Sequence, residues 1–136
     1  MNMANNLSIF DISGRAMAAQ LVRLNTTASN LANAGSVSGS EASAYRAMKP
    51  VFRTIMGEAG TATVAVDQVT QATSSPTKRH DPSHPLADKD GNVWEAAVDS
   101  AAELVEMVET SRQYQNNVQV LSTAKGLISE TLRLGQ

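Results

Sequence analysis

The strongest structural signal in this chain is the stretch from Trp94 to Leu134, WEAAVDSAAELVEMVETSRQYQNNVQVLSTAKGLISETLRL. It contains no proline and a single glycine, and apolar or small residues recur along it in alternating steps of three and four. This spacing predicts a helix that buries one face, and at 1.5 Å per residue the helix is a rod about 60 Å long. The recurring positions are Ala97, Ser100, Leu104, Met107, Ser111, Tyr114, Val118, Leu121, Lys125, Ile128 and Leu132.

Acidic residues crowd the first half of this stretch, and basic residues lie in its second half, which is the arrangement that the helix dipole favours. We assign the acidic side chains to a solvated face of the helix. They are Glu95, Asp99, Glu103, Glu106 and Glu109.

The other end of the chain carries a similar signal from Ser8 to Asn33, which has one glycine and no proline. The same alternating spacing predicts a helix of about 26 residues, and Gly35 is placed to cap its C-terminal end. The recurring positions are Phe10, Gly14, Met17, Leu21, Leu24, Ala28 and Leu31.

Residues 35–92 have a different composition. Tyr45–Ile55 and Thr61–Val69 favour strands, and the glycines between them predict a β-hairpin. The stretch from Thr70 to Gly91 holds three of the four prolines, so we interpret it as an irregular loop. The predicted fold class is therefore mainly α, with long terminal helices and a small β-hairpin and loop insertion. The predicted organisation is a discontinuous helical module, 1–34 and 93–136, around a central segment, 35–92.

Both helices lack charge where a solvated helix normally carries it. Residues 24–40 contain no charged side chain, and residues 113–129 contain only Lys125. Val120, Leu127 and Leu134 repeat every seven residues on the side away from the main apolar row, so the C-terminal helix is apolar on two sides. Since apolar area left in water is unfavourable, we expect other copies or other subunits to cover the second side. The alternative is a monomer that folds its own middle segment over it.

Length and composition exclude several classes of protein. The 136 residues fit one domain, and the absence of cysteine excludes disulfides, thiolate metal sites and cysteine nucleophiles. A net charge of −2 without a basic patch excludes the usual nucleic-acid binder. No run is long enough for a transmembrane segment, and Met1–Asn6 lacks the pattern of a cleaved secretory signal, so any export would need another route.

The sequence offers no convincing catalytic, cofactor or metal site. The nearest candidates for metal ligands, His80, His84, Asp88 and Asp90, lie in a proline-rich stretch with no helix to fix their geometry. No serine lies near a base motif, and glycine-rich phosphate loops are absent. We therefore expect neither an enzyme nor a cofactor.

Both ends of the chain resemble the axial proteins of bacterial flagella, the rod and hook family. At the N-terminal end the matching runs are IFDISG (9–14), RLN (23–25) and ASNLANA (28–34). At the C-terminal end HPLAD (84–88) with Gly91, EMV (106–108) and SRQYQNNVQVLSTAK (111–125) look like the proximal rod branch of the family. The short middle segment fits that branch as well.

The resemblance implies a structural subunit of the proximal rod, the helical drive shaft that transmits motor torque and encloses the export channel. It implies terminal helices paired as an antiparallel coiled coil in the inner layer of the tube, with the middle segment outside. It also implies export by the flagellar type III pathway without a cleaved signal, and a place in the rod across the periplasm. The implied partners are other copies of the chain, the membrane ring, the export apparatus and the sibling rod proteins FlgB, FlgF, FlgG and FliE.

We expect packing and subunit contacts at fourteen positions. The resemblance supplies eight of them: Ala28, Asn30, Leu31, Asn33, Tyr114, Asn117, Val118 and Leu121. The apolar rows of the two helices supply the other six: Leu21, Leu24, Leu104, Met107, Leu127 and Ile128. A soluble helical adaptor or export chaperone, binding partner helices through the same uncharged faces, is the alternative function.

Overall fold

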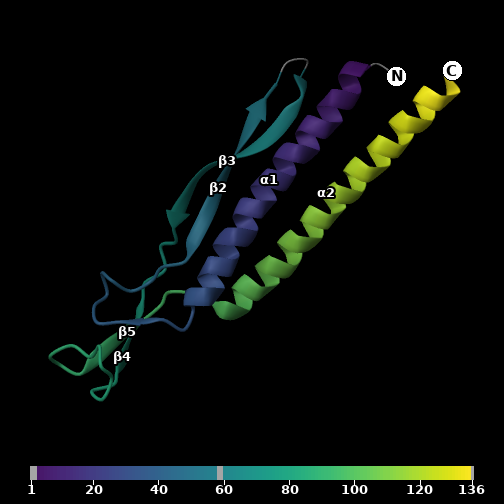
Figure 1. Ribbon diagram of the computed structural model, residues 1–136. Coiled ribbons are helices and arrows are strands. Elements are labelled where there is room, and N and C mark those ends of the chain that lie inside the picture. Colours follow the sequence, from purple (N-terminus) through teal and green to yellow (C-terminus); the bar gives the residue numbers. More distant parts are fainter. Residues whose placement is uncertain (1–2, 58–59, 136) are drawn as a thin grey trace.

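The computed structural model describes residues 3–57 and 60–135 (Figure 1). Two terminal helices are present as predicted, but the predicted fold class is wrong. Helices hold 49% of the chain, and 25% lies in antiparallel strands of two separate sheets, so the strands are more than a small insertion. The elements are α1 (Met3–Asn33), β1 (Val37–Ser38), β2 (Met48–Met56), β3 (Ala62–Gln71), β4 (Thr77–His80), β5 (Asn92–Glu95) and α2 (Ser100–Leu134).

The two helices and the β2–β3 hairpin lie side by side along one long axis (Figure 1). The helices run antiparallel, and α1 packs both on α2 and on the hairpin. The N- and C-terminal ends of the chain therefore share one end of the molecule, and β4 and β5 extend beyond the other end. Because α2 has a helical neighbour on one side only, much of its surface is left without cover.

The hairpin joins the two runs that the sequence predicts as strands. Its antiparallel register runs from Met48 opposite Gln71 to Met56 opposite Ala62, with a bulge between Val51 and Phe52. A bulge bends the strand that carries it and increases its twist.

The second sheet, in the order β1–β5–β4, was not predicted. Strand β4 lies inside the stretch interpreted as an irregular loop. All four of its residues, Thr-Lys-Arg-His, are polar and exposed, so the sequence lacks the alternation of apolar and polar residues that marks a half-buried strand. Cross-strand contacts support the pairing instead. Arg79 forms an ion pair with Glu95 at 3.2 Å, and Lys78 Nζ lies 5.8 Å from the centre of the Trp94 ring.

The turn between β4 and β5 depends on Gly91 and Asp88. Gly91 has a φ of +74°, and a Cβ at this position would lie 3.0 Å from Cγ of Pro82. Oδ1 of Asp88 accepts the backbone N–H groups of Asn92 at 2.8 Å and Asp90 at 2.9 Å. The hydrogen bond from the Asn92 backbone, followed by that from Asp90, lowers the pKa of the Asp88 carboxyl below its ordinary value.

Helix α2 begins at Ser100, and the predicted start at Trp94 is wrong. Trp94 belongs to β5, where it pairs with Ser38 and Lys78. The helix starts after Asp99 because Oδ1 of that residue accepts the backbone N–H groups of Ala101 at 3.0 Å and Ala102 at 3.1 Å. At the other end of the chain, α1 starts upstream of the predicted Ser8 and ends at the predicted Asn33.

Replacing the N-cap residue should loosen the start of α2. Asp99→Ala removes the acceptor for two backbone N–H groups and is expected to cost about 1 kcal/mol of unfolding free energy. Urea unfolding followed by circular dichroism measures the loss. Ser100→Ala, an exposed neighbour, is the control and should leave the midpoint nearly unchanged; equal midpoints for both variants would contradict the assigned cap.

Candidate subunit interface

The contact between α1 and α2 is unusually polar. Among the buried residues of the two helices, counted from Ile9 in α1 and over Ser100–Leu134 in α2, only Ala19 is apolar. The buried polar residues are Ser13, Thr27 and Asn30 of α1 and Glu103 and Thr110 of α2. We call these five residues the polar seam. Since a buried polar group is costly without a hydrogen-bond partner, the hydrogen bonds of Asn30 and Glu103 decide where the helices meet. The hydroxyl of Thr110 is buried without a hydrogen-bond partner among the described residues.

Asn30 is the best-satisfied residue of the polar seam. Its Nδ2 donates to the backbone oxygen of Met48 at 2.9 Å and to Oε2 of Glu103 at 3.0 Å. Its Oδ1 accepts the backbone N–H of Met48 at 2.7 Å and the hydroxyl of Tyr45 at 3.0 Å. Both donors and both acceptor positions of the amide are used. One side chain therefore joins α1 to the start of β2 and to α2.

Glu103 completes this junction. Its Oε1 accepts a hydrogen bond from Nζ of Lys49 at 2.8 Å. The Glu103 side chain is only 4% exposed, whereas that of Lys49 is 50% exposed. A buried carboxylate needs such partners, because the loss of its hydration is expensive. Lys49 and Asn30 together hold the carboxylate between the hairpin and both helices.

Further polar contacts between the two helices follow over about three turns toward the chain ends. Arg23 forms an ion pair with Glu106, and its guanidinium carbon lies 6.0 Å from the centre of the Phe52 ring. Nε2 of Gln20 donates to Oε1 of Gln113 at 2.8 Å. Among the residues that the structure describes, no side-chain hydrogen bond joins the two helices closer to the chain ends than this one.

Sequence reasoning missed most of this junction. Glu103 and Glu106 were assigned to a solvated face, but Glu103 is buried and Glu106 is half-buried. Glu103 forms an ion pair with Lys49, and Glu106 forms one with Arg23. The sequence marks both as exposed acids because their partners, Lys49 and Arg23, lie far away along the chain. Glu103, Glu106 and Thr110 follow one another at steps of three and four, so they lie on one face of α2. This shared face was the signal in the sequence that could have revealed the contact.

The structure separates the fourteen expected contact residues into three groups. Asn30 alone is fully buried. Eight are half-buried: Leu24, Leu31, Asn33, Met107, Tyr114, Asn117, Leu121 and Ile128. Five are exposed in this chain: Leu21, Ala28, Leu104, Val118 and Leu127.

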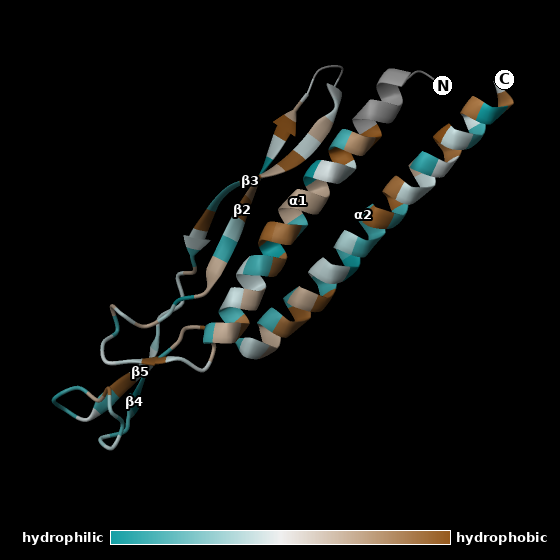
Figure 2. Cartoon of the chain, viewed as in Figure 1, coloured by the Kyte–Doolittle hydropathy of each residue, from teal (hydrophilic) through white to brown (hydrophobic). Residues whose placement is uncertain are grey.

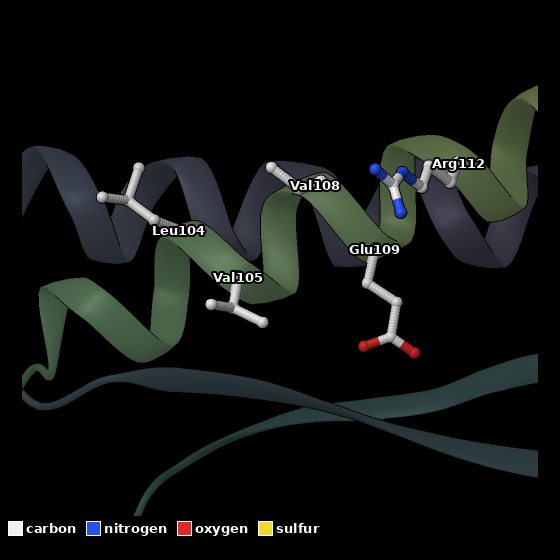
Figure 3. Close-up of a pocket in the computed structure, with 5 residues that line it drawn as sticks. All are labelled: Leu104, Val105, Val108, Glu109 and Arg112. Carbon is white, nitrogen blue, oxygen red and sulfur yellow. The ribbon is translucent and has the colours of Figure 1, made fainter.

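The first turns of α2 expose an apolar cluster. Leu104, Val105 and Val108 are 54%, 67% and 54% exposed, so more than half of each side chain has no cover from this chain. With Glu109 and Arg112 they line a shallow hollow of about 470 Å³. Figure 3 shows Leu104, Val108 and Arg112 along one edge of the helix, and Val105 and Glu109 on the side toward the strands. We call the three apolar residues the outer cluster.

A second uncovered region lies near the chain ends. Val120 and Leu127 are about half exposed, and Leu134 is 89% exposed. The first two line a hollow of about 320 Å³ together with Ile9 of α1. Figure 2 shows hydrophobic residues spread along both helices. Apolar surface of this extent on a small protein indicates contact with other molecules.

The described residues offer little for other kinds of site. They contain no group of three metal-ligating side chains, and no helix among them is long and apolar enough to span a membrane. His80 and His84 are engaged locally: Nδ1 of His80 lies 3.1 Å from Oδ1 of Asn92, and Nδ1 of His84 accepts the backbone N–H of Leu86.

Known proteins resemble this chain at both ends and along nearly its full length. Residues 10–39 match the family model of the flagella basal body rod protein, and residues 89–134 match that of the flagellar basal body rod FlgEFG protein C-terminal. The flagellar basal-body rod proteins FlgC of Salmonella typhimurium and of Escherichia coli O6:H1 are each 45% identical over 132 residues, covering 96% of this chain and 98% of theirs. FlgC of Buchnera aphidicola subsp. Schizaphis graminum is 36% identical over 139 residues, with the same coverage.

Removing the amide of Asn30 should destabilise the whole junction. Asn30→Ala leaves the buried Glu103 carboxylate and the Met48 backbone groups short of partners, so we expect a loss of about 3 kcal/mol in unfolding free energy. Chemical denaturation measures it. Asn25→Ala, on the exposed side of the same helix, is the matched control. A loss below about 0.5 kcal/mol for Asn30→Ala would show that the junction does not hold the fold.

Proposed function

The chain belongs to the family of the flagellar basal-body rod protein FlgC and is a structural subunit of that rod, and on this premise we propose how it is built into the shaft. Copies of the chain pack with one another and with sibling rod proteins into a helical tube. The tube encloses the export channel and transmits motor torque. This role needs many fixed contacts and no reacting group, so we assign the chain no catalytic activity and no cofactor.

The observation that carries this proposal is the uncovered apolar surface of α2. The outer cluster and the row of Val120, Leu127 and Leu134 are exposed although the chain has folded its middle segment. Burying apolar surface stabilises an assembly by about 25 cal/mol per Å². Partner subunits are therefore the natural cover, and the alternative of a self-covered monomer loses its main support.

The expected contact residues divide between two roles in this proposal. The buried and half-buried positions, such as Asn30, Leu31 and Tyr114, position the two helices. The exposed ones, Leu21, Ala28, Leu104, Val118 and Leu127, contact neighbouring subunits. We place the discontinuous module, 1–34 and 93–136, in the inner layer of the tube, and the central segment, 35–92, outside it.

The proposed location is the part of the rod that crosses the periplasm. The partners are further copies, FlgB, FlgF, FlgG, FliE, the membrane ring and the export apparatus. We propose export through the flagellar type III pathway without a cleaved signal. The polar character of the α1–α2 contact supports this route, because a helix pair with few buried apolar side chains unfolds at low cost before passage through a narrow channel.

A charge on the outer side of α2 should block incorporation without unfolding the chain. Leu127 is 52% exposed, so Leu127→Asp is expected to change the melting temperature of the purified chain little. In the rod the same aspartate would be buried without a partner, so the variant should be missing from purified basal bodies and the cells should not swim.

Lys125→Asp is the matched control, because this position on the same helix already carries a solvated charge. It should incorporate and support swimming. Normal amounts of the Leu127→Asp chain in basal bodies would contradict the proposal that this side of α2 contacts neighbours.

A further inference from the structure

We infer that the outer cluster of α2 receives α1 of a second copy of this chain, which lies antiparallel across it through its residues 11–21. The inference rests on the proposed function and names the contact that would link one copy to the next. It joins two different surfaces of the molecule, one on each helix.

The surface on α2 projects apolar side chains. Leu104, Val105 and Val108 stand on the first turns of the helix, away from the polar seam, and nothing within the described chain covers them (Figure 3). Their exposed area is flanked on its C-terminal side by Glu109 and Arg112. A helix that binds here must therefore be apolar where it covers the outer cluster and charged where it lies against Glu109 and Arg112.

The surface on α1 carries small side chains that can accommodate the projecting side chains of the outer cluster. Gly14, Ala18 and Leu21 are exposed at steps of four and three, so they share one face of the helix. A Cβ at Gly14 would meet nothing within 4 Å, so no contact within the chain requires glycine there. Glycine inside a helix is less favourable than alanine, and the close approach of a second helix gives it a reason.

The charges at the edges of the two surfaces fix the relative direction. Asp11 and Arg15 lie next to Gly14 and form an ion pair with each other at 3.1 Å, with both side chains about half exposed. Among the described residues, Arg112 has no ion-pair partner. An antiparallel crossing sets Arg112 opposite Asp11 and Glu109 opposite Arg15. A parallel crossing sets like charges against each other, which is unfavourable.

The antiparallel register also matches the apolar parts. With Arg112 opposite Asp11, the outer cluster falls opposite residues 15–19, with Val105 opposite Ala18 and with Gly14 and Leu21 at the two edges of the contact. Because the two surfaces differ and every copy carries both, the contact is head-to-tail. Such a contact does not close on itself as a two-fold dimer does, and it produces a ring or an open helical stack.

Cysteine cross-linking tests the contact directly, because the chain has no cysteine of its own. Val105→Cys and Ala18→Cys are made in separate, differently tagged chains, and both are expressed in one cell. Basal bodies are purified and treated with a mild oxidant. We expect a disulfide that joins the two tags. The pair of Val105→Cys with Gln71→Cys, an exposed position on β3, is the control and should not cross-link.

Charge reversal provides the second arm. Asp11→Lys and Arg112→Glu should each lower the amount of chain in the rods about tenfold, because each places like charges together at the contact. The two changes in one chain should restore near-normal incorporation. Gly14→Ala should raise the melting temperature of the isolated chain while lowering its incorporation.

The outcomes separate the inference from the proposed function. Three results would overturn the inference and leave the proposed rod function in place. The rods could contain both cysteine variants but show no cross-link between the tags. Alternatively, a cross-link could join two Val105→Cys chains, or could join this chain to a sibling protein. Failure of the double charge variant to recover would overturn it too. Absence of the unmodified chain from basal bodies would instead refute the proposed function.

Discussion

Asn30 lies where both helices and the hairpin meet, and its side-chain amide orders the fold. Its four hydrogen bonds reach the backbone of Met48, the hydroxyl of Tyr45 and the carboxylate of Glu103. A buried polar network is stable only when all of its members are satisfied, so α1, the hairpin and α2 must meet in one register. The contact that orders the fold is therefore directional, whereas apolar packing alone tolerates sliding.

A polar contact inside the molecule leaves the apolar side chains outside. Among the residues whose burial the structure describes, Val93 and four alanines form the buried apolar core, while branched side chains of α2 such as Leu104 and Val105 remain exposed. A chain built in this way gains little stability alone and gains more when neighbours cover it, so that folding and assembly are coupled. This arrangement suits a rod subunit, which has to form a rigid shaft only after it has joined its partners.

The sequence predicted that both terminal helices exist, but it missed where they start and how they contact each other. Steps of three and four placed both helices and the end of α1 at Asn33, but α2 is apolar on two sides, and periodicity cannot tell which side faces α1. The contact passes through Glu103 and Thr110, one position before Leu104 and Ser111 in the predicted row. Glu103 depends on Lys49, 54 residues away, and no local pattern reveals such a partner. Strand β4 was missed for a similar reason, since backbone pairing holds its polar residues in place.

Hydrogen exchange of backbone amides, measured on the isolated chain and on the same chain in purified basal bodies, shows whether the folding of α2 is coupled to assembly. We expect the isolated chain to protect the amides around Asn30 and in the first turns of α2, while the amides from Asn117 to Leu134 exchange quickly and become protected only in the rod. Uniformly slow exchange along the whole of α2 in a monomer at low concentration would contradict this expectation, because the outer faces would then need no neighbour.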